Sequence, residues 1–295
     1  MSRFGCLFSR ADFRESGFDG NTNLQQSPIE GHLYSLSDHK SCHESSPLSS
    51  PSTSPRLLII IATYNELENL PELVQQLETL LPTADLLVID DGSPDGTGEW
   101  CDERKATDPR LSVIHRPGKM GLGSATVAGF EYGLANDPPY DLLATMDADF
   151  SHDPKSLVEL VQFLESDIQQ DFGGVIGSRY VPGGGIENWP WMRHVSSRGV
   201  NFVAKFLLGL KTKDNSGAFR VYRASTLNSI DPGKIESSSF AYLEEILWRI
   251  RKQKIAMKEL PITFRDRELG ASKTSLKLGV SVFWHLLKIR MGLVK

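Results

Sequence analysis

The feature that most constrains the fold is the stretch "RLLIII" at residues 56–61, in which Arg56 is followed by an uninterrupted apolar run. A run of this length, rich in branched apolar side chains, predicts a strand that is buried on both faces. The next segment, "NLPELVQQLETLL" (69–81), has apolar residues at helical spacing, with Asn69 as the expected N-cap, Pro71 in the first turn and Glu72 at capping-box spacing. A buried strand followed by an amphipathic helix predicts one unit of a parallel sheet.

The same alternation of strand and helix continues along the chain with short connections. Further strands are expected at 84–92, 111–116, 140–149 and 173–180, and further helices at 97–106, 123–137 and 154–166. Elements that alternate in this order build a mostly parallel central sheet covered by helices on both faces. The sequence therefore predicts an α/β fold.

The segment before this pattern differs in composition. Residues 1–55 are rich in Ser and Pro and lack apolar periodicity, which predicts a disordered leader. The net charge of −5 gives no electrostatic case for a nucleic-acid partner. Cys6, Cys42 and Cys101 show neither metal-site nor disulfide spacing, so a reducing compartment is expected. Without a secretory signal or an apolar run of roughly 18–20 residues, we expect a soluble or peripheral protein.

Polar clusters follow four of the expected strands. They are "TYNE" (63–66), "DDGSPDG" (90–96), "DADFSH" (147–152) and "SRY" (178–180). In open sheets of this kind, ligands bind outside the carboxyl ends of the strands. These clusters are far apart in sequence, but we expect them to meet along one edge of the sheet.

Two carboxylates, Asp147 and Asp149, are separated only by Ala148. Side chains two residues apart on extended backbone point the same way, so the charges repel unless a cation lies between them or one is protonated. Mg²⁺ and Mn²⁺ commonly bind one or two carboxylates plus substrate phosphates. The pair predicts a metal site, with a solvated acidic turn as the alternative. His152 could extend that site, but we expect it instead to cap a helix or to support a metal ligand from behind.

Two other segments indicate a nucleotide pocket. Asp90 and Asp91 precede a glycine-rich turn, where one acid could accept hydrogen bonds from a base or ribose, or form an Asx-type turn without a ligand. The loop "GKMGLGSAT" (118–126) has Thr126 in place of the third glycine of a dinucleotide motif and follows the third strand. A dinucleotide oxidoreductase is therefore disfavoured. We expect a helix N-terminus there, with Lys119 near phosphate.

Basic side chains recur after the predicted strands. They are Arg179, Arg193, Arg198, Arg220, Arg223, Arg265, Arg267 and Lys273. The planar guanidinium group matches the geometry of phosphate oxygens. Any one of them alone is most simply a surface charge, but together they indicate a site that handles several phosphates.

Two apolar segments near the C-terminal half could contact lipid. Trp189 and Trp191 precede apolar residues at helical spacing in 200–210, which is typical of a membrane-interface helix or of ordinary core packing. The segment 280–295 has the same character. Its basic residues could meet anionic head groups: Lys288, Arg290 and Lys295.

Eight motifs in order carry a family resemblance. They are "IATYNELENLPELV", "VIDDGSPDGT", "GLGSA", "MDADFSH", "GSRY", "RHVSSRGVNF", "DNSGAFRVYR" and "FRDRELGASK". Over about 56–275, the chain resembles the polyprenol-phosphate (dolichyl-phosphate) mannosyltransferases of the inverting GT-A glycosyltransferase family 2. The resemblance implies a Rossmann-like GT-A nucleotide-sugar-binding domain at 56–275, followed by an amphipathic C-terminal tail at 276–295.

The resemblance also implies the reaction. Such an enzyme transfers mannose from GDP-mannose to a polyprenyl phosphate, using Mg²⁺ or Mn²⁺, and inverts the anomeric centre to give a β-mannosyl phosphate. It would work at the cytoplasmic face of a membrane as a peripheral protein, with or without a membrane-anchoring partner subunit. Two alternatives stay open: a sister transferase that moves glucose or another sugar from UDP or GDP to the same lipid, and a non-catalytic nucleotide-sugar-binding protein.

Roles carried over from the family by position divide into three groups. The metal ligands would be Asp147 and Asp149, with Ser151 where many members have Gln. The donor site would comprise Thr63, Tyr64, Glu66, Asp91, Asp147, Ala148, Arg267 and Lys273. The acceptor phosphate would meet Arg179, Arg193 and Ser197, and the groups counted as catalytic are Asp149, Arg179 and Arg193. Glu244 and Glu245 are candidates for a sugar contact or, equally, a pair on a helix surface.

Overall fold

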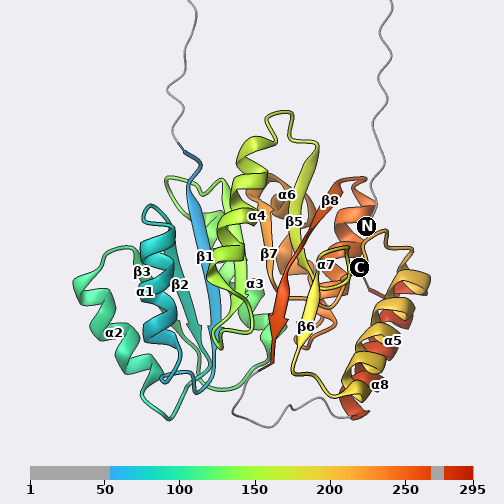
Figure 1. Ribbon diagram of the computed structural model, residues 1–295, viewed down its shortest axis with the longest axis horizontal. Coiled ribbons are helices and arrows are strands. Elements are labelled where there is room, and N and C mark those ends of the chain that lie inside the picture. Colours follow the sequence, from blue (N-terminus) through green and yellow to red (C-terminus); the bar gives the residue numbers. More distant parts are fainter. Residues whose placement is uncertain (1–53, 267–275, 295) are drawn as a thin grey trace, which may run out of the picture. The chain divides into compact units, whose positions relative to one another are not determined.

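The structure, a computed structural model, describes residues 54–266 and 276–294, so the predicted leader lies almost wholly outside the described residues. The centre is a seven-stranded sheet in the order β3-β2-β1-β4-β7-β5-β8 (Figure 1). Its strands are β1 (Leu57–Thr63), β2 (Asp85–Asp90), β3 (Leu111–His115), β4 (Leu142–Asp147), β5 (Phe172–Ser178), β7 (Arg220–Arg223) and β8 (Ala256–Pro261). The predicted mostly parallel sheet is confirmed.

One strand runs against the others. β7 pairs antiparallel with both β4 and β5, whereas β1, β2, β3 and β4 are parallel neighbours and β5 is parallel to β8. No strand was expected at 220–223, because four residues carry too little pattern to be recognised. The reversal brings the start of β7, rather than its end, to the edge where β4 and β5 end.

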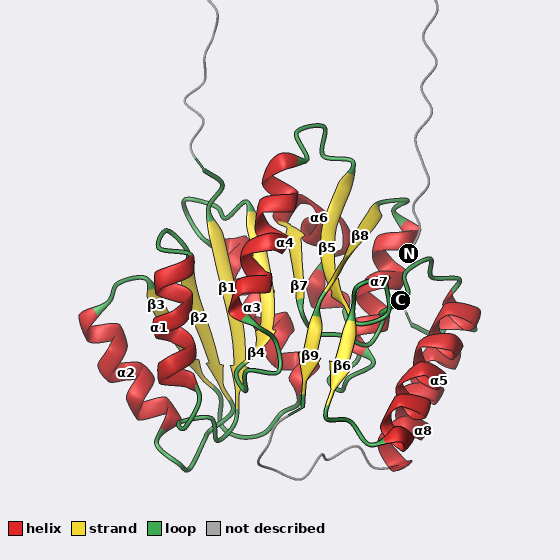
Figure 2. Cartoon of the chain, in the orientation of Figure 1, coloured by secondary structure: helices red, strands yellow, loops and turns green. Residues whose placement is uncertain are grey.

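Helices cover both faces of the sheet (Figure 2). They are α1 (Leu70–Leu80), α2 (Thr97–Thr107), α3 (Leu122–Ala135), α4 (Pro154–Ser166), α5 (Trp191–Leu208), α6 (Ala224–Ile230), α7 (Tyr242–Lys252) and α8 (Leu276–Arg290), with a short 3₁₀ turn at Pro232–Lys234. Alternate residues of β1 face opposite ways. Leu57, Ile59 and Ile61 pack with α1 and α4, while Leu58 and Ile60 pack with α3, α6 and α7.

The start of α1 differs in detail from the sequence prediction. Asn69 is the N-cap and Pro71 lies in the first turn, as expected, but no side chain caps the helix. The Asn69 amide instead donates to Glu66 Oε2 at 3.1 Å, and the Glu72 carboxylate accepts from Gln76 one turn later. The expected capping box is therefore wrong, because both side chains have closer partners elsewhere.

A small sheet and two long helices complete the domain beyond β5. β6 (Gly185–Glu187) pairs with β9 (Thr263–Arg265), and α5 and α8 lie side by side at the end of the domain (Figure 1). A separate apolar core joins α8 to α5 and α7 through Val282, Leu286, Ala204, Leu208 and Leu247. The predicted tail at 276–295 thus includes a helix packed on the rest of the domain.

Candidate active site

Parallel strands bring the predicted site residues to one edge of the sheet, the lower edge in the view of Figure 2. In the strand register, Thr63 at the end of β1 is opposite Asp90 of β2, and Ala62 is opposite Asp147 of β4. The polar clusters that begin at these positions are therefore neighbours. This is the juxtaposition that the carboxyl ends of parallel strands predict.

Asp90 stabilises the turn that follows β2. Its carboxylate accepts hydrogen bonds from the backbone N–H and the hydroxyl of Ser93, at 3.1 and 2.5 Å, and from Thr63 Oγ1 at 3.3 Å. The side chain is buried, so all of this bonding is internal. Of the two alternatives for the acidic pair, Asp90 takes the Asx-turn role.

Asp91 is also buried and holds the next loop in place. Its Oδ2 accepts from the backbone N–H of Met120 at 3.1 Å, and its Oδ1 lies 3.0 Å from Arg116 Nε in a close ion pair. Arg116 in turn donates to the hydroxyl of Ser124 at the start of α3. The predicted contact between Asp91 and guanosine stays a prediction, and it would have to share this carboxylate with Arg116.

The glycine loop before α3 is a helix N-terminus, as the sequence predicts. Gly121 caps α3 with φ of +100°, a conformation that favours glycine. A Cβ at Gly121 or Gly123 would stand 2.4 Å from the backbone oxygens of 237–238, so the glycines permit close packing. Lys119 Nζ lies 4.2 Å from the ring centroid of Tyr64, which brings this loop over the end of β1.

The other residues predicted to line the donor pocket are largely internal. Thr63 and Glu66 are buried, and the backbone N–H of Glu66 donates to Thr97 Oγ1 at 3.1 Å. Only Tyr64 of the three keeps a partly exposed side chain. Thr63 and Glu66 are therefore internal, and their direct contact with a nucleotide stays a prediction.

The paired carboxylates stand where β4 ends. Asp147 and Asp149 flank Ala148, which is buried, while the Asp147 side chain is 34% exposed. Asp149 Oδ1 accepts from the backbone N–H of Ser151 at 3.1 Å, and Phe150 has φ of +58°. The backbone turn itself therefore fixes the position of the second carboxylate.

His152 supports this strand end, as expected, and does so as a neutral ring. Its Nδ1 accepts the backbone N–H of Asp147 at 3.2 Å, and the ring stacks on Phe219 with centroids 4.7 Å apart. Complete burial lowers the pKa of His152 to about 4, although the charge of Asp149 acts in the opposite direction. At neutral pH the 3.8 Å approach to the Asp147 carboxylate is therefore no ion pair.

The donor set at this position suits a hard divalent cation. Within residues 54–266 and 276–294, no third His, Cys, Asp or Glu joins the two carboxylates as a metal cluster. Mg²⁺ usually binds through one or two carboxylates plus substrate phosphates, so the pair is sufficient for a cation that a pyrophosphate completes. Ser151 is buried, and its hydroxyl has no hydrogen-bond partner in the described part of the chain.

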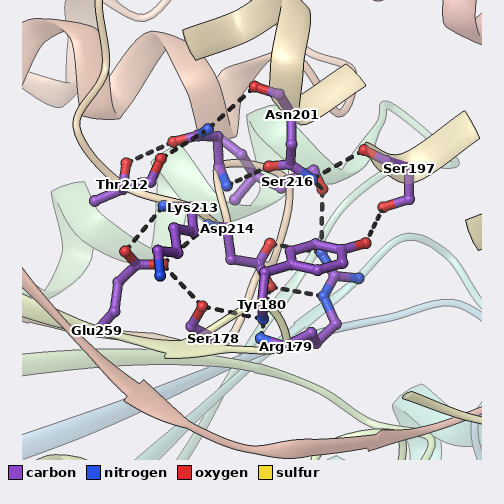
Figure 3. Close-up of polar contacts among 12 residues, drawn as sticks. Ser178, Arg179, Tyr180, Ser197, Asn201, Thr212, Lys213, Asp214, Ser216 and Glu259 are labelled. Atoms are coloured by element: carbon purple, nitrogen blue, oxygen red, sulfur yellow. Dashed lines mark hydrogen bonds and ion pairs between the residues drawn. The ribbon is translucent and has the colours of Figure 1, made fainter. Parts of the chain in front are cut away.

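Arg179, beyond the end of β5, forms a buried ion pair with Asp214 (Figure 3). Its Nε and Nη2 donate to the two carboxylate oxygens at 2.7 and 2.6 Å, and its backbone N–H donates to Oδ2 at 3.0 Å. Burial opposes the charge on both groups, yet the pairing holds the pKa of Asp214 below its ordinary value. Arg179 thus has a structural role here, and its contact with acceptor phosphate stays a prediction.

Arg193 at the start of α5 is held by a second acid. Its Nη1 donates to Asp266 Oδ2 at 2.6 Å, and its guanidinium group lies 4.2 Å from the ring centroid of Trp189. This pair is half-buried, with 24% and 22% of the two side chains exposed. Unlike the buried pair of Arg179, it can exchange with a ligand from solvent.

An aromatic cluster joins the carboxylate end of the site to the arginine end. The ring of Phe264 lies 5.5 Å from the ring of His152, 5.5 Å from the Arg179 guanidinium and 5.5 Å from the ring of Trp189. His152 is bonded to Asp147, and Trp189 lies beside Arg193. The residues predicted to bind the metal and those predicted to bind the acceptor phosphate therefore lie in one continuous cluster.

Ser197 belongs to the same network. The Tyr180 hydroxyl donates to Ser197 Oγ at 2.7 Å, and Asn201 donates to the Ser197 carbonyl and to Ser216 Oγ (Figure 3). Ser216 also accepts from Arg179 at 3.1 Å. Hydrogen bonds thus connect one face of α5 to the segment after β5 that carries Arg179.

Two of the arginines predicted to bind phosphate are instead engaged inside the protein. Because β7 is antiparallel, Arg223 lies at the opposite end of the sheet, where it donates to the carbonyls of Phe172 and Leu164. Arg220 is at the correct edge but completely buried, and it donates to the carbonyls of Asn215 and Leu243. Both guanidinium groups also have side-chain partners inside the protein: Arg223 pairs with Asp167 Oδ2 at 3.2 Å, and Arg220 donates to the Tyr222 hydroxyl at 3.2 Å.

The remaining basic residues divide between exposed positions and undescribed ones. Arg198 is exposed, and Arg265 pairs with Glu187 in an exposed contact at 3.0 Å. Arg267 and Lys273, predicted to clamp the donor pyrophosphate, lie outside the described residues.

The interpretation of Glu244 and Glu245 as a surface pair is wrong, because both are buried. Glu245 accepts from Arg249 at 2.8 Å and shares its other oxygen with His285 Nε2 at 2.8 Å, which ties α7 to α8. Burial raises the pKa of Glu244 to about 7, and its Oε2 has no hydrogen-bond partner in the described part of the chain. A sugar contact by Glu244 stays a prediction.

Three site residues were not identified from the sequence. The sequence indicates no role for Asp214 in "DNSGAFRVYR", places Arg116 only at the end of an expected strand, and predicts a membrane interface or core for Trp189. For Asp214, the sequence offers one indication. An acidic residue that stands between apolar segments is expected to pair with a buried basic residue, here an arginine. Nothing local to Arg116 or Trp189 reveals their partners, which are distant in sequence.

Comparison with known proteins identifies relatives over most of the chain. The model for "Glycosyl transferase family 2" matches residues 58–230. The "Undecaprenyl-phosphate mannosyltransferase" of Micrococcus luteus is 42% identical over 249 residues, covering 81% of this chain and 100% of that protein. The "Polyprenol monophosphomannose synthase" of Mycolicibacterium smegmatis is 44% identical over 221 residues, covering 75% of this chain and 81% of that protein.

Solved structures support the fold. Glucosyl-3-phosphoglycerate synthase from Mycobacterium tuberculosis, in complex with Mn²⁺, UDP and glucosyl-3-phosphoglycerate, superposes with a TM-score of 0.59. The identity is 14%, and the match covers 81% of this chain and 80% of that one. At this level of identity the likeness shows a common fold and nothing about substrates.

Proposed function

The chain belongs to glycosyl transferase family 2 and has the GT-A fold, and on that premise we propose that it transfers mannose from GDP-mannose to a polyprenyl phosphate with inversion at the anomeric carbon. The observation that carries the proposal is 42% and 44% identity to two mannosyltransferases whose names specify polyprenyl phosphate acceptors. Those alignments cover 81% and 75% of this chain.

On this proposal, the end of β4 is the donor end of the site. Asp147 and Asp149 would hold Mg²⁺ or Mn²⁺, which when bound acts as a Lewis acid on the donor pyrophosphate. The neutral ring of His152 fixes the Asp147 backbone without adding positive charge that would compete with the cation. Asp91, with Tyr64 and the 118–121 loop above it, would receive the nucleoside.

The arginine end would receive the acceptor. A phosphate monoester has a second pKa of roughly 6, so the attacking oxygen is an anion near neutral pH and needs no strong general base. Catalysis then depends on holding two anionic groups in line and offsetting their repulsion. Arg193 is placed for this task, because its pair with Asp266 is accessible to solvent. A single displacement from the α-linked donor would give a β-mannosyl phosphate.

We also propose that the enzyme rests on a lipid surface through α5 and α8. In the described residues, no helix combines the length and apolarity needed to cross a bilayer. The two helices nevertheless expose large apolar side chains, here called the α5/α8 surface: Trp191, Met192, Val195, Phe202 and Phe206 on α5, and Val280, Phe283 and Trp284 on α8. Large apolar groups beside basic residues are typical of helices that lie in the membrane interface.

The basic residues near this surface favour an anionic membrane. Arg198 and Lys205 on α5 are exposed, and Arg290 on α8 is exposed beyond the apolar residues. Such charges contribute roughly 1 kcal/mol each near an anionic bilayer. A lipid acceptor would then meet the site at the start of α5, where Arg193 lies only two residues after Trp191.

Vesicle flotation tests the lipid contact. Phe202→Ser with Phe206→Ser should reduce binding to vesicles that contain anionic phospholipid, since these side chains are 71% and 79% exposed. Ile168→Ser is the matched control, because Ile168 is 88% exposed but lies between α4 and β5, away from the α5/α8 surface. Equal loss in both variants, or no loss in either, would contradict the assigned surface.

A transfer assay tests the activity itself. Purified protein is incubated with Mn²⁺ and a polyprenyl phosphate, with labelled GDP-mannose or labelled UDP-glucose as the donor. We expect metal-dependent lipid labelling from GDP-mannose alone, abolished in Asp149→Asn. Asp153→Asn is the control, because Asp153 caps α4 through the Lys155 N–H and asparagine is an equally good N-cap. Labelling from UDP-glucose alone would establish the sister transferase, and binding without transfer from either donor would favour a nucleotide-sugar-binding protein.

A further inference from the structure

The arginine end of the site contains a buried donor with no acceptor. Trp189 Nε1 is shielded from solvent, and no residue in the described ranges accepts its hydrogen. An indole nitrogen can only donate, and a buried donor left unpaired destabilises the folded protein. Native structures keep few such groups, so each calls for a physical explanation.

The surroundings of Trp189 indicate which acceptor is missing. The Arg193 guanidinium lies 4.2 Å and the Arg179 guanidinium 5.6 Å from its ring centroid. Phe264 and His194 pack edge-on against the same ring, at 5.5 and 5.6 Å. The indole is thus fixed by aromatic neighbours between two cations. A hydrogen-bond acceptor that binds beside Trp189 would therefore be favoured if it carried negative charge.

The two arginines differ in how readily they can take a new anion. Arg179 is bound to Asp214, which is completely buried, through two side-chain hydrogen bonds. Arg193 is bound to Asp266 through one, and both side chains of that pair are about one-quarter exposed, at 24% and 22%. A phosphate can therefore exchange with Asp266 on Arg193 while the Arg179 pair stays intact.

We propose that Trp189 is an acceptor-binding residue whose indole N–H donates to the phosphate of the lipid acceptor when that phosphate replaces Asp266 on Arg193. The inference rests on the proposed function and extends it to a residue that supplies an uncharged hydrogen-bond donor beside Arg193. The indole N–H carries no charge. It can therefore orient the phosphate without adding positive charge to a region where carboxylates already balance the arginines.

Steady-state kinetics separate the N–H from the ring. Trp189→Phe keeps an aromatic ring under Arg193 but removes the donor, and a hydrogen bond to a charged group corresponds to about a tenfold or greater change in binding. We expect the KM for polyprenyl phosphate to rise by about that factor, with the KM for GDP-mannose unchanged and the melting temperature no lower than that of the wild type. Trp189→Leu, which also removes the ring, should raise the acceptor KM further.

Trp248→Phe is the matched control for these variants. Trp248 also lies beneath basic side chains, with Lys252 Nζ 4.5 Å from its ring centroid, but it packs in the core between α5, α7 and α8. Its kinetic constants should equal those of the wild type. An acceptor KM unchanged in Trp189→Phe, or a rise in both KM values with a lower melting temperature, would overturn the inference.

A binding measurement keeps the inference independent of the activity. In protein labelled with ¹⁵N at tryptophan, the indole resonance that disappears in Trp189→Phe identifies Trp189. Geranyl phosphate, a water-soluble prenyl monophosphate, should move this resonance downfield, and geraniol, which lacks the phosphate, should not. If geranyl phosphate shifts other indole resonances but leaves the Trp189 resonance unchanged, the proposed contact is refuted. A shift without any mannosyl transfer would instead refute the proposed function alone.

Discussion

The buried pair of Arg179 and Asp214 makes the most direct energetic prediction. Asp214→Asn keeps the shape of the side chain but removes its charge. The Arg179 side chain is only 7% exposed, so water cannot hydrate its positive charge once the charge of Asp214 has been removed. Breaking a buried pair by neutralising one partner costs about 3–5 kcal/mol. For a domain of this size each kcal/mol lowers the melting temperature by about 2–4 °C, so we expect a fall of about 6–20 °C.

The assay is thermal and urea unfolding of the wild type beside Asp214→Asn and Asp231→Asn. Asp231 also pairs with a basic residue, Lys234, at 2.9 Å, but both side chains are more than half exposed. Exposed pairs are screened by water and salt, so this control should unfold with the wild type. A loss in Asp214→Asn below about 1 kcal/mol, the ceiling for exposed pairs, would refute the reasoning.

The same pair sets a pH dependence with a definite sign. Asp214 has a lower pKa in the folded protein than its ordinary value of 3.8, because hydrogen bonds and the charge of Arg179 outweigh the effect of burial. Its contribution to stability is therefore complete above pH 3.8 and is lost as the pH falls through the lower, folded-state pKa. The difference in unfolding free energy between wild type and Asp214→Asn should narrow over that acidic range.

Three further predictions address other parts of the domain. Burial raises the pKa of the Cys101 thiol to about 12, so at pH 8 this thiol should resist alkylation in the native protein and react after unfolding, as followed by peptide mass spectrometry. Gly123→Ala would place a Cβ 2.4 Å from a backbone oxygen and should lower stability by about 1–3 kcal/mol in urea unfolding, whereas Gly279→Ala in α8, with open space around the new methyl group, should not. Glu245→Gln should accelerate amide hydrogen exchange across 276–290, because the 2.8 Å contact with His285 holds α8 to α7; unchanged exchange would assign that role to apolar packing alone.

Much of the fold could be predicted from the sequence because its signals are local. "RLLIII" predicts a strand buried on both faces, and β1 is buried along nearly its whole length. The strand ends predicted at 63–66, 90–96 and 147–152 meet at one edge, since parallel strands with short connections must end on the same side. The short antiparallel strand β7 carried no comparable pattern, and that single reversal is what misplaced Arg223.

The candidate site divides in the same way. The sequence by itself determined the paired carboxylates at the end of β4, because their spacing and the strand before them are local features. Only the tertiary structure decided the arginine end, because the accessibility of each guanidinium, and its freedom to bind a new anion, depend on acids that are distant in sequence: Asp214 for Arg179 and Asp266 for Arg193. The sequence shows which charges a protein has, but their effect depends on burial and partners, which only packing determines.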